Sequence, residues 1–183
     1  MKLHLGCWRR QIPGFIHVDL CDMPHIDHQS GIDRLPFLKD GSASLVYCSH
    51  AFEYFDRLQA VEVLAEWRRV LAPGGLLRLA VPDFDALAGI YRDTGDISTV
   101  LGPLYGRMTI PTRDGDSILF HRTAYDFPSL AGMLEANGFQ DAHRWDWRTT
   151  EHAHIDDFSQ AYFPHMQKDT GRQVSLNVEA TKA

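Results

Sequence analysis

Residues 45–81 read LVYCSHAFEYFDRLQAVEVLAEWRRVLAPGGLLRLAV, and this stretch decides the fold class. Two short apolar runs, residues 45–48 and 76–81, have the composition of strands that are covered on both faces. Between them, apolar residues recur at helical spacing from Arg57 to Leu71. The residues expected to form this apolar face are Leu58, Val61, Leu64, Ala65, Val70 and Leu71. Pro73-Gly74-Gly75 is expected to end the helix. A strand, a helix and a second strand in succession are typical of a parallel sheet.

The same alternation extends outward from this stretch in both directions. Before it, we expect strands over residues 2–5 and 15–20, which are separated by the turn residues Pro13-Gly14. After it, we expect helices over residues 83–91, 97–105 and 127–137, and strands over 139–147 and 174–180. Gly171-Arg172 is a candidate turn between the last two strands. The pattern therefore predicts an α/β fold, a Rossmann-like doubly wound sheet with helices on both faces, mostly parallel with an antiparallel C-terminal strand.

The length of the chain favours a single domain. With 183 residues, it is long enough for one sizeable core and too short for two full domains. We therefore expect one domain over residues 1–183, with a lid or insertion at 93–126 and a His-rich segment at 148–171.

Composition limits the expected partners. The net charge is -6, from 18 basic and 24 acidic residues, and no block of Lys or Arg stands out, so we expect no nucleic-acid partner. No apolar run approaches the length of a membrane span. The three cysteines form no CxxC pair, and the N-terminus MKLHLGCW does not resemble a signal peptide. We expect a cytoplasmic protein that acts on a small molecule, and the sequence leaves its oligomeric state open.

Polar residues follow the ends of several expected strands. In a parallel sheet these ends share one edge, where ligands bind. Gly6 follows the first strand, and a glycine lets a ligand approach the backbone closely. Asp19 follows the second strand, and its carboxylate is able to accept two hydrogen bonds from a ribose diol. The other residues expected around this crevice are Ser49, His50, Asp83 and Asp85.

Several segments carry a more specific resemblance. They are LPF at residues 35–37, SHAFEY at 49–54 and WRRVLAPGGLLRL at 67–79. Together with LHLGC at residues 3–7 and PGFIHVDL at 13–20, they resemble the class I S-adenosylmethionine-dependent methyltransferases of the small methyltransferase-domain type. The resemblance covers nearly the whole chain, and the segment from Val70 to Leu76 is its most specific part.

The resemblance implies a cofactor and a site. The cofactor is S-adenosylmethionine, and the acceptor is a small or sugar-containing molecule. Gly6 approaches the methionine and ribose part, Asp19 holds the ribose hydroxyls and Asp33 lies near the adenine. His50 is the candidate catalytic base. The full set of cofactor-binding residues that we expect is Leu5, Gly6, Cys7, Asp19, Asp33, Leu35, Ser49 and His50.

Two departures from the family pattern keep alternatives open. The family's turn continues as G-C-G, whereas this chain has Trp8 at the second glycine, and Glu53-Tyr54 stands where the family has E-H. An inactive relative that keeps the fold as a binding or assembly module is therefore the second hypothesis. A nicotinamide-dependent oxidoreductase is a third hypothesis, and the absence of G-x-G-x-x-G argues against it.

The His-rich segment has two interpretations. His152 and His154 are close in sequence to Asp156 and Asp157, and this pattern is compatible with a divalent metal. Ten histidines in the chain make chance pairs easy, however. We expect no metal site and interpret the segment as a cap packed over the crevice.

Overall fold

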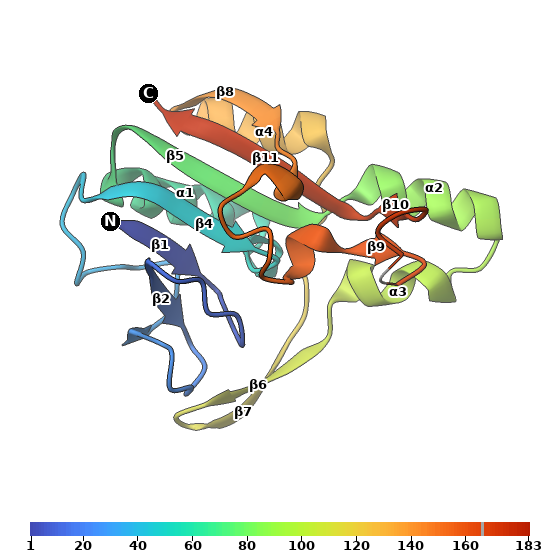
Figure 1. Cartoon of the computed structure of the whole chain (residues 1–183), viewed down its shortest axis with the longest axis horizontal. Helices are drawn as coiled ribbons and strands as arrows, with labels where there is room; N and C mark the ends of the chain where they lie inside the picture. The colour runs from blue at the N-terminus through green and yellow to red at the C-terminus, as the bar shows by residue number, and fades with distance from the viewer. Residues whose placement is uncertain (166) are drawn as a thin grey trace.

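A seven-stranded sheet forms the centre of the molecule (Figure 1). The computed structural model describes residues 1–165 and 167–183. The strand order is β3-β2-β1-β4-β5-β11-β8. The strands are β1 Lys2–Leu5, β2 Phe15–Asp19, β3 His28–Gln29, β4 Ala43–Ser49, β5 Leu71–Pro82, β8 Phe139–Arg144 and β11 Ser175–Lys182. Strands β1 to β5 pair in parallel, and β11 runs antiparallel to both β5 and β8. The predicted Rossmann-like sheet with an antiparallel C-terminal strand is confirmed.

Helix α1, Arg57–Val70, begins as its sequence predicts. The Asp56 carboxylate accepts hydrogen bonds from the backbone N–H groups of Leu58 and Gln59. In return, the Gln59 side chain accepts a hydrogen bond from the Asp56 N–H, which completes a capping box. The helix ends at Val70, and β5 begins at Leu71. Pro73-Gly74-Gly75 therefore lies inside β5, and the expectation that it ends the helix was wrong.

The buried face of α1 also differs from the predicted one. Leu58 is 82% exposed and Val61 is 43% exposed. The residues that this helix buries are Ala60, Val63, Leu64, Trp67 and Val70. The prediction placed the apolar face too far toward Leu58 and Val61, because it gave no weight to Trp67. Trp67 is fully buried, and its indole N–H donates to the Ile32 carbonyl oxygen at 2.7 Å.

The two faces of the sheet are covered differently. Helices α1 and α4, Phe127–Ala136, lie behind the sheet in Figure 1 and contribute Val63, Leu64, Leu130 and Leu134 to the larger core. The opposite face packs Tyr47 and Ala80 against Trp145 and the following loop. Helices α2, Phe84–Thr94, and α3, Ser98–Tyr105, stand beyond the end of β5. None of the helices in the described residues is long and apolar enough to cross a membrane.

The segment from 106 to 126 contains a hairpin that we did not predict. Strands β6, Met108–Thr112, and β7, Gly115–Leu119, pair antiparallel, although we expected a loop here. The hairpin reaches from α3 toward the loop after β2, where the Asp22 N–H donates to the Pro111 carbonyl oxygen at 3.4 Å.

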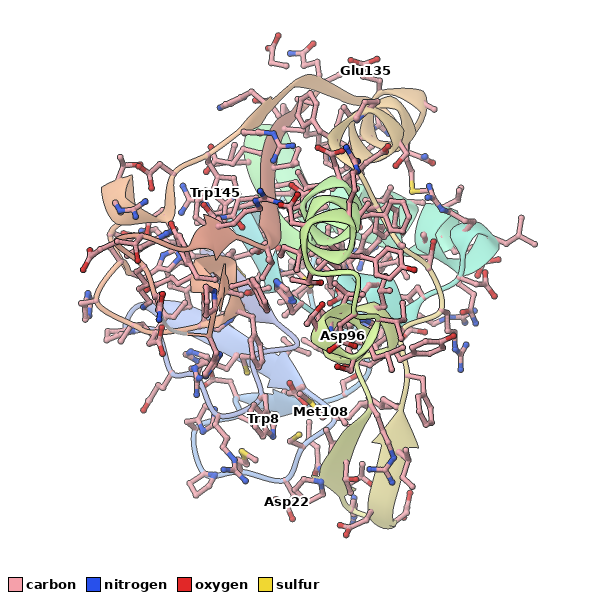
Figure 2. All side chains as sticks on the ribbon, turned by 90° about the vertical axis from the view of Figure 1, so that its right-hand side faces the viewer. Trp8, Asp22, Asp96, Met108, Glu135 and Trp145 are labelled. Atoms are coloured by element: carbon pink, nitrogen blue, oxygen red, sulfur yellow. The ribbon has the colours of Figure 1, made fainter. Side chains whose placement is uncertain are left out.

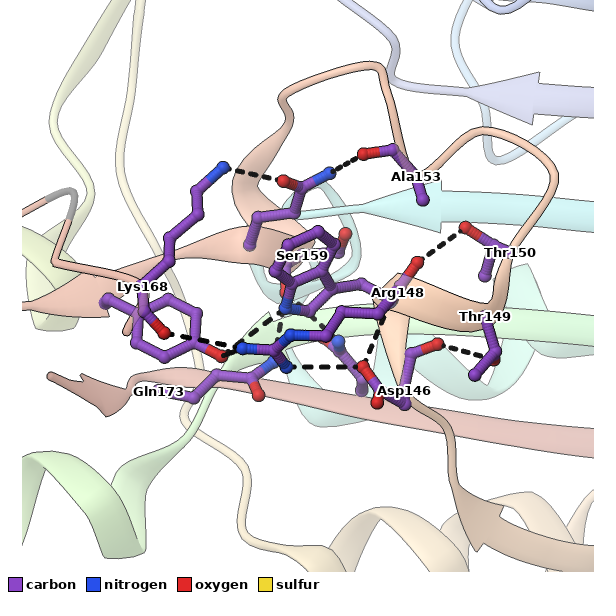
Figure 3. A network of polar contacts seen from close by, with 12 residues as sticks. Asp146, Arg148, Thr149, Thr150, Ala153, Ser159, Lys168 and Gln173 are labelled. Carbon is purple, nitrogen blue, oxygen red and sulfur yellow. Dashed lines mark hydrogen bonds and ion pairs between the residues drawn. The ribbon is translucent and has the colours of Figure 1, made fainter. Parts of the chain in front are cut away.

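The segment made of residues 146–165 and 167–173 is held by polar contacts among its own residues (Figure 3). It contains the short helices η2, Trp147–Thr149, and η3, Phe158–Gln160. Arg148 donates to the Tyr162 hydroxyl at 3.1 Å, and Lys168 donates to Gln160 Oε1 at 2.7 Å. Strands β9, Tyr162–Phe163, and β10, Arg172–Gln173, form a separate pair. The candidate turn at Gly171-Arg172 therefore leads into β10 and does not join β8 to β11.

Candidate active site

The carboxyl ends of β1, β2, β4 and β5 meet at one edge of the sheet, as predicted. At the end of β1, Gly6 has a φ of +67°, and its N–H donates to the Val18 carbonyl oxygen at 2.9 Å. A Cβ added to Gly6 would collide with the Cβ of Ala51. Both the backbone conformation and the close approach therefore require glycine at this position.

Asp19, at the end of β2, is nearly buried and receives two backbone hydrogen bonds. Its Oδ2 accepts from the Trp8 N–H at 2.7 Å, and its Oδ1 accepts from the Cys21 N–H at 2.9 Å. A carboxylate has about four lone-pair positions, so each oxygen retains capacity for one more donor. This arrangement is suited to the two hydroxyl groups of a ribose.

Trp8 lies in the same crevice in a strained conformation. Its φ of +43° is in the left-handed region, which favours glycine. Its indole Nε1 is buried and has no hydrogen-bond partner among the described residues. Figure 2 shows Trp8 close to Met108 of the hairpin strand β6. The cavity lined by Gly6, Trp8, Met108 and Ser49 has a volume of only about 30 Å³.

These observations test whether the residues fit S-adenosylmethionine. The donor set fits, because Gly6 exposes backbone and Asp19 has free lone pairs for a ribose diol. The volume of about 30 Å³ is far below the roughly 300–1,000 Å³ of ordinary ligand pockets. The cofactor therefore fits this edge only when the Trp8 side chain or the β6–β7 hairpin moves away from it.

A second, much larger cavity of about 970 Å³ adjoins this edge. Its lining is mainly apolar and comes from α3, η3, β9 and the loops around them, including Leu101, Tyr105 and Phe163. Five residues line both cavities, so the two share a wall: Arg10, His50, Met108, Asp157 and Phe158. A small molecule in the large cavity would thus lie next to the strand ends.

His50 belongs to a buried cluster at the base of the large cavity. Its Nδ1 lies 3.5 Å from Glu53 Oε1, and His121 Nε2 lies 3.5 Å from the same oxygen. Burial lowers the pKa of His50 to about 3 and raises the pKa of Glu53 to about 8. Both histidines line the large cavity. The sequence singled out His50 as a candidate but did not predict that it lies beside Glu53 and His121, because this arrangement depends on the tertiary fold.

The structure separates the remaining predicted cofactor residues. Cys7 and Ser49 line the small cavity beside Gly6. Leu5 and Leu35 are fully buried in the core, and their side chains do not reach either cavity. Asp33 is exposed in a groove with Arg34 and residues of α1, so the structure does not bring it to Gly6.

Asp83 and Asp85 follow β5 as expected, but they belong to the N-terminus of α2. The Asp83 carboxylate accepts from the Asp85 N–H at 3.2 Å, which caps the helix. It also lies 3.2 Å from a guanidinium nitrogen of Arg144. Neither aspartate lines the small or the large cavity.

The His-rich segment does not gather its side chains around one point. His152 is buried against Tyr47, with ring centroids 4.6 Å apart. Asp157 accepts hydrogen bonds from the Tyr47 hydroxyl and from Ser159, whereas Asp156 pairs with Lys168 at 2.7 Å. Within residues 1–165 and 167–183, no group of three or more His, Cys, Asp or Glu side chains is arranged to hold a metal ion.

Comparisons with known proteins agree with this fold. Residues 13–79 match the family described as "Methyltransferase domain". A putative S-adenosylmethionine-dependent methyltransferase from Listeria monocytogenes is 16% identical with a TM-score of 0.55, covering 99% of this chain and 89% of that one. A methyltransferase from Methanosarcina mazei is 15% identical with a TM-score of 0.56, covering 98% and 91%. No curated protein sequence matches the chain.

A third similar structure contains ligands. It is the 1,6-didemethyltoxoflavin-N1-methyltransferase from Burkholderia thailandensis, with bound 1,6-didemethyltoxoflavin and S-adenosylhomocysteine. It is 14% identical with a TM-score of 0.52, covering 92% of this chain and 61% of that one. Residues 13–79, less than half of the chain, are thus similar to the methyltransferase-domain family, and the similar structures show that the whole chain has the fold of S-adenosylmethionine-dependent methyltransferases.

Proposed function

We propose that the protein transfers a methyl group from S-adenosylmethionine to a small-molecule or sugar-containing acceptor. The observation that carries this proposal is the wall shared by the two cavities: His50 lines both the strand-end crevice beside Gly6 and the large apolar cavity of about 970 Å³. Direct transfer would require the sulfonium methyl group and the acceptor atom to meet at roughly 3–3.5 Å, where a movement of the shared wall joins the two cavities.

The roles follow from the positions of the side chains. Gly6 and Asp19 would hold the nucleoside part of the cofactor, and the cofactor supplies a methyl group already activated on a sulfonium. The large cavity would orient the acceptor and exclude water through apolar residues such as Leu101 and Phe163. Segments 93–126 and 148–171 both contribute to its lining, which supports their proposed role in acceptor selection.

Two further observations favour a small acceptor. The net charge of -6 disfavours binding of a long polyanion. The Burkholderia neighbour, a 1,6-didemethyltoxoflavin-N1-methyltransferase with this small molecule bound, has the same fold. Action in the cytoplasm remains a prediction from the sequence.

Isothermal titration calorimetry with S-adenosylmethionine and S-adenosylhomocysteine tests the proposal. We expect saturable binding with one site per chain for both ligands. The absence of detectable heat with either ligand at millimolar concentration, in protein shown to be folded by circular dichroism, would contradict the methyltransferase proposal.

A non-enzymatic binding module is the second candidate function. The positive φ of Trp8 and the closed volume of about 30 Å³ favour it, because the chain's own atoms fill the cofactor edge. Replacing Trp8 by glycine discriminates between the candidates. A module that has lost the cofactor site for other reasons stays unable to bind after the substitution.

A further inference from the structure

One nitrogen from each of two imidazole rings lies near the same buried carboxyl oxygen. His50 Nδ1 and His121 Nε2 each lie 3.5 Å from Glu53 Oε1. Glu53 is completely buried, and neither of its carboxyl oxygens has a hydrogen-bond partner within the described part of the chain. Burying an ionised carboxylate without a donor is costly. The energetic cost of burying Glu53 therefore depends on how many protons the cluster holds.

Hydrogen bonds on its far side fix the tautomer of His50. Asn177 Nδ2 donates to the Ser159 carbonyl oxygen at 3.0 Å, so Asn177 Oδ1 faces Ser175 and accepts from its hydroxyl at 2.8 Å. A hydroxyl has one proton. Ser175 Oγ is therefore an acceptor toward His50 Nε2, which lies 3.0 Å away. His50 carries its proton on Nε2 and presents the Nδ1 lone pair to Glu53.

The surroundings of His121 fix its tautomer in the same way. His121 Nδ1 lies 3.0 Å from the Pro103 carbonyl oxygen, which only accepts hydrogen bonds. Nδ1 therefore carries the proton, and Nε2 presents a lone pair to Glu53. The ring is held edge-on to Tyr54 at a centroid distance of 4.8 Å, and it packs where a Cβ on Gly106 would collide with it.

An ionised Glu53 would thus face two lone pairs, and only its own backbone N–H would be near enough to stabilise the charge. One additional proton removes the repulsion between the carboxylate and the lone pairs. This proton is able to lie on the carboxyl oxygen or on either of the two facing nitrogens. We propose that Glu53, His50 and His121 hold one proton in common at the wall of the large cavity, and that this cluster is the base that takes up a proton from the acceptor. Glu53 is the positioning residue, and the use of the cluster in catalysis rests on the proposed methyltransferase function.

The electrostatic surroundings agree with one shared proton. Burial lowers the pKa of both histidines and raises the pKa of Glu53 to about 8, which favours a neutral acid between neutral rings. The other titratable side chains that feel the charge of Glu53 have raised pKa values and are uncharged at neutral pH: Cys48, Tyr54 and Tyr125. Among the described residues, no Lys or Arg side chain forms an ion pair with Glu53.

This cluster predicts the chemical class of the acceptor. The cluster holds one proton but has more than one free lone pair, so a histidine nitrogen is able to accept a second proton. When an X–H nucleophile takes the methyl group, a C–X bond forms, the electron pair of the broken C–S bond stays on sulfur, and the X–H proton passes to the cluster. The site is therefore suited to a neutral hydroxyl acceptor, because the methylated oxygen must lose its proton and is acidic enough to give it to a histidine whose pKa is lowered. The side chains of His50 and His121 are 12% and 7% exposed, whereas Glu53 is closed off, so the histidines form the side of the cluster nearest the cavity.

Spectroscopy of the free protein tests the shared proton without any cofactor. In the infrared difference between wild type and Glu53→Gln near pH 6.5, we expect the C=O stretch of one protonated carboxylic acid, and its loss above pH 8. In nitrogen-15 NMR of histidine-labelled protein, we expect the Nε2–H tautomer for His50 and the Nδ1–H tautomer for His121. If the acid band is missing but one histidine ring is doubly protonated, the cluster still holds one additional proton, and this result also supports the proposal.

An ionised Glu53 beside two neutral rings at pH 6.5 would overturn the proposal. So would the Nδ1–H tautomer of His50. Glu179→Gln is the matched control, because Glu179 lies 3.9 Å from the exposed His143 and should give no acid band. If Glu53→Gln fails to fold, His121→Gln provides the second variant, in which the acid band should persist but shift. Because neither spectrum requires ligand, failure of cofactor binding would leave this test intact.

Discussion

The two sides of the shared wall are built in opposite ways. At the strand ends, Gly6, Trp8 and Asp19 leave a volume of about 30 Å³. A few residues away, the cavity lined by α3 and the segment after β8 encloses about 970 Å³. The proposed cofactor edge is filled by the chain's own backbone and side chains, whereas the proposed acceptor side is open.

This difference indicates where substitutions should matter for stability and where they should matter for binding. Residues at the filled edge are held by close contacts and by a carboxylate that accepts two backbone hydrogen bonds. Residues at the open cavity contact empty volume on one side. We therefore expect large losses of stability at the edge and small losses around the cavity.

Among the residues that line the two cavities, the largest expected effect is at Gly6. Gly6→Ala forces an alanine to a φ of +67° and places its Cβ against Ala51. Left-handed backbone and overpacking together should lower the free energy of unfolding by about 3 kcal/mol. Urea denaturation followed by circular dichroism measures this loss.

Gly14→Ala is the matched control for Gly6→Ala. Gly14 has a φ of +82°, but nothing lies within 4 Å of an added Cβ. This substitution should cost only about 1–2 kcal/mol, from the backbone conformation alone. Equal losses at the two positions would show that the close approach to Ala51 contributes nothing.

The second effect concerns pH and Glu53. The pKa of Glu53 is raised from 4.5 to about 8 by burial, so the folded state binds more protons than the unfolded state between these values. Stability must then fall as pH rises from about 4.5 to about 8. Relative to Glu53→Gln, wild type should lose on the order of 2 kcal/mol between pH 5 and pH 8. Denaturation curves of both proteins across this range measure it, and a rise with pH would contradict the buried neutral acid.

The third effect is on ligand binding at Trp8. Trp8→Gly relieves a φ of +43° and empties volume beside Asp19. We expect S-adenosylhomocysteine to bind about tenfold more tightly to this variant, which corresponds to about 1.4 kcal/mol. Calorimetry of both proteins measures the difference. Trp8→Phe retains an aromatic ring and should show little gain, whereas equal affinity of wild type and Trp8→Gly would refute blockage by Trp8.

The smallest expected effect is at the open cavity. Tyr105 is 61% exposed, so Tyr105→Ala should change the free energy of unfolding by no more than about 0.5 kcal/mol. The buried Tyr125, stacked on Phe52 at 5.5 Å, is the matched tyrosine, and Tyr125→Ala should cost about 3–5 kcal/mol. A loss above about 1 kcal/mol at Tyr105 would mean that the cavity wall is packed more tightly than the structure indicates.

The sequence predicted the sheet well because its strands are short apolar runs with clear boundaries. The region from Leu45 to Val81 forms β4, α1 and β5, and only the end of the helix and its buried face differ. The hairpin of β6 and β7 was missed because its strands are polar and include Pro111, which weakens a strand pattern. Asp114-Gly115 is a hairpin signal that was available in the sequence.

The site was less predictable than the fold. Gly6, Asp19 and His50 lie where the ends of parallel strands must place them. The cluster of Glu53 with His121 joins residues far apart in the chain, and the Arg122 N–H bonded to the Glu53 carbonyl oxygen at 2.9 Å brings them together. The position of Asp33 on a different surface depends on the course of an irregular loop, which a sequence pattern does not determine.

A crystal structure of the protein grown with millimolar S-adenosylhomocysteine tests the central claim most directly. We expect the nucleoside beside Gly6, its ribose hydroxyls on the Asp19 carboxylate and the Trp8 indole moved from its present position. Ligand bound away from Asp19, or no bound ligand and an unmoved Trp8, would contradict the assignment of this edge as the cofactor site.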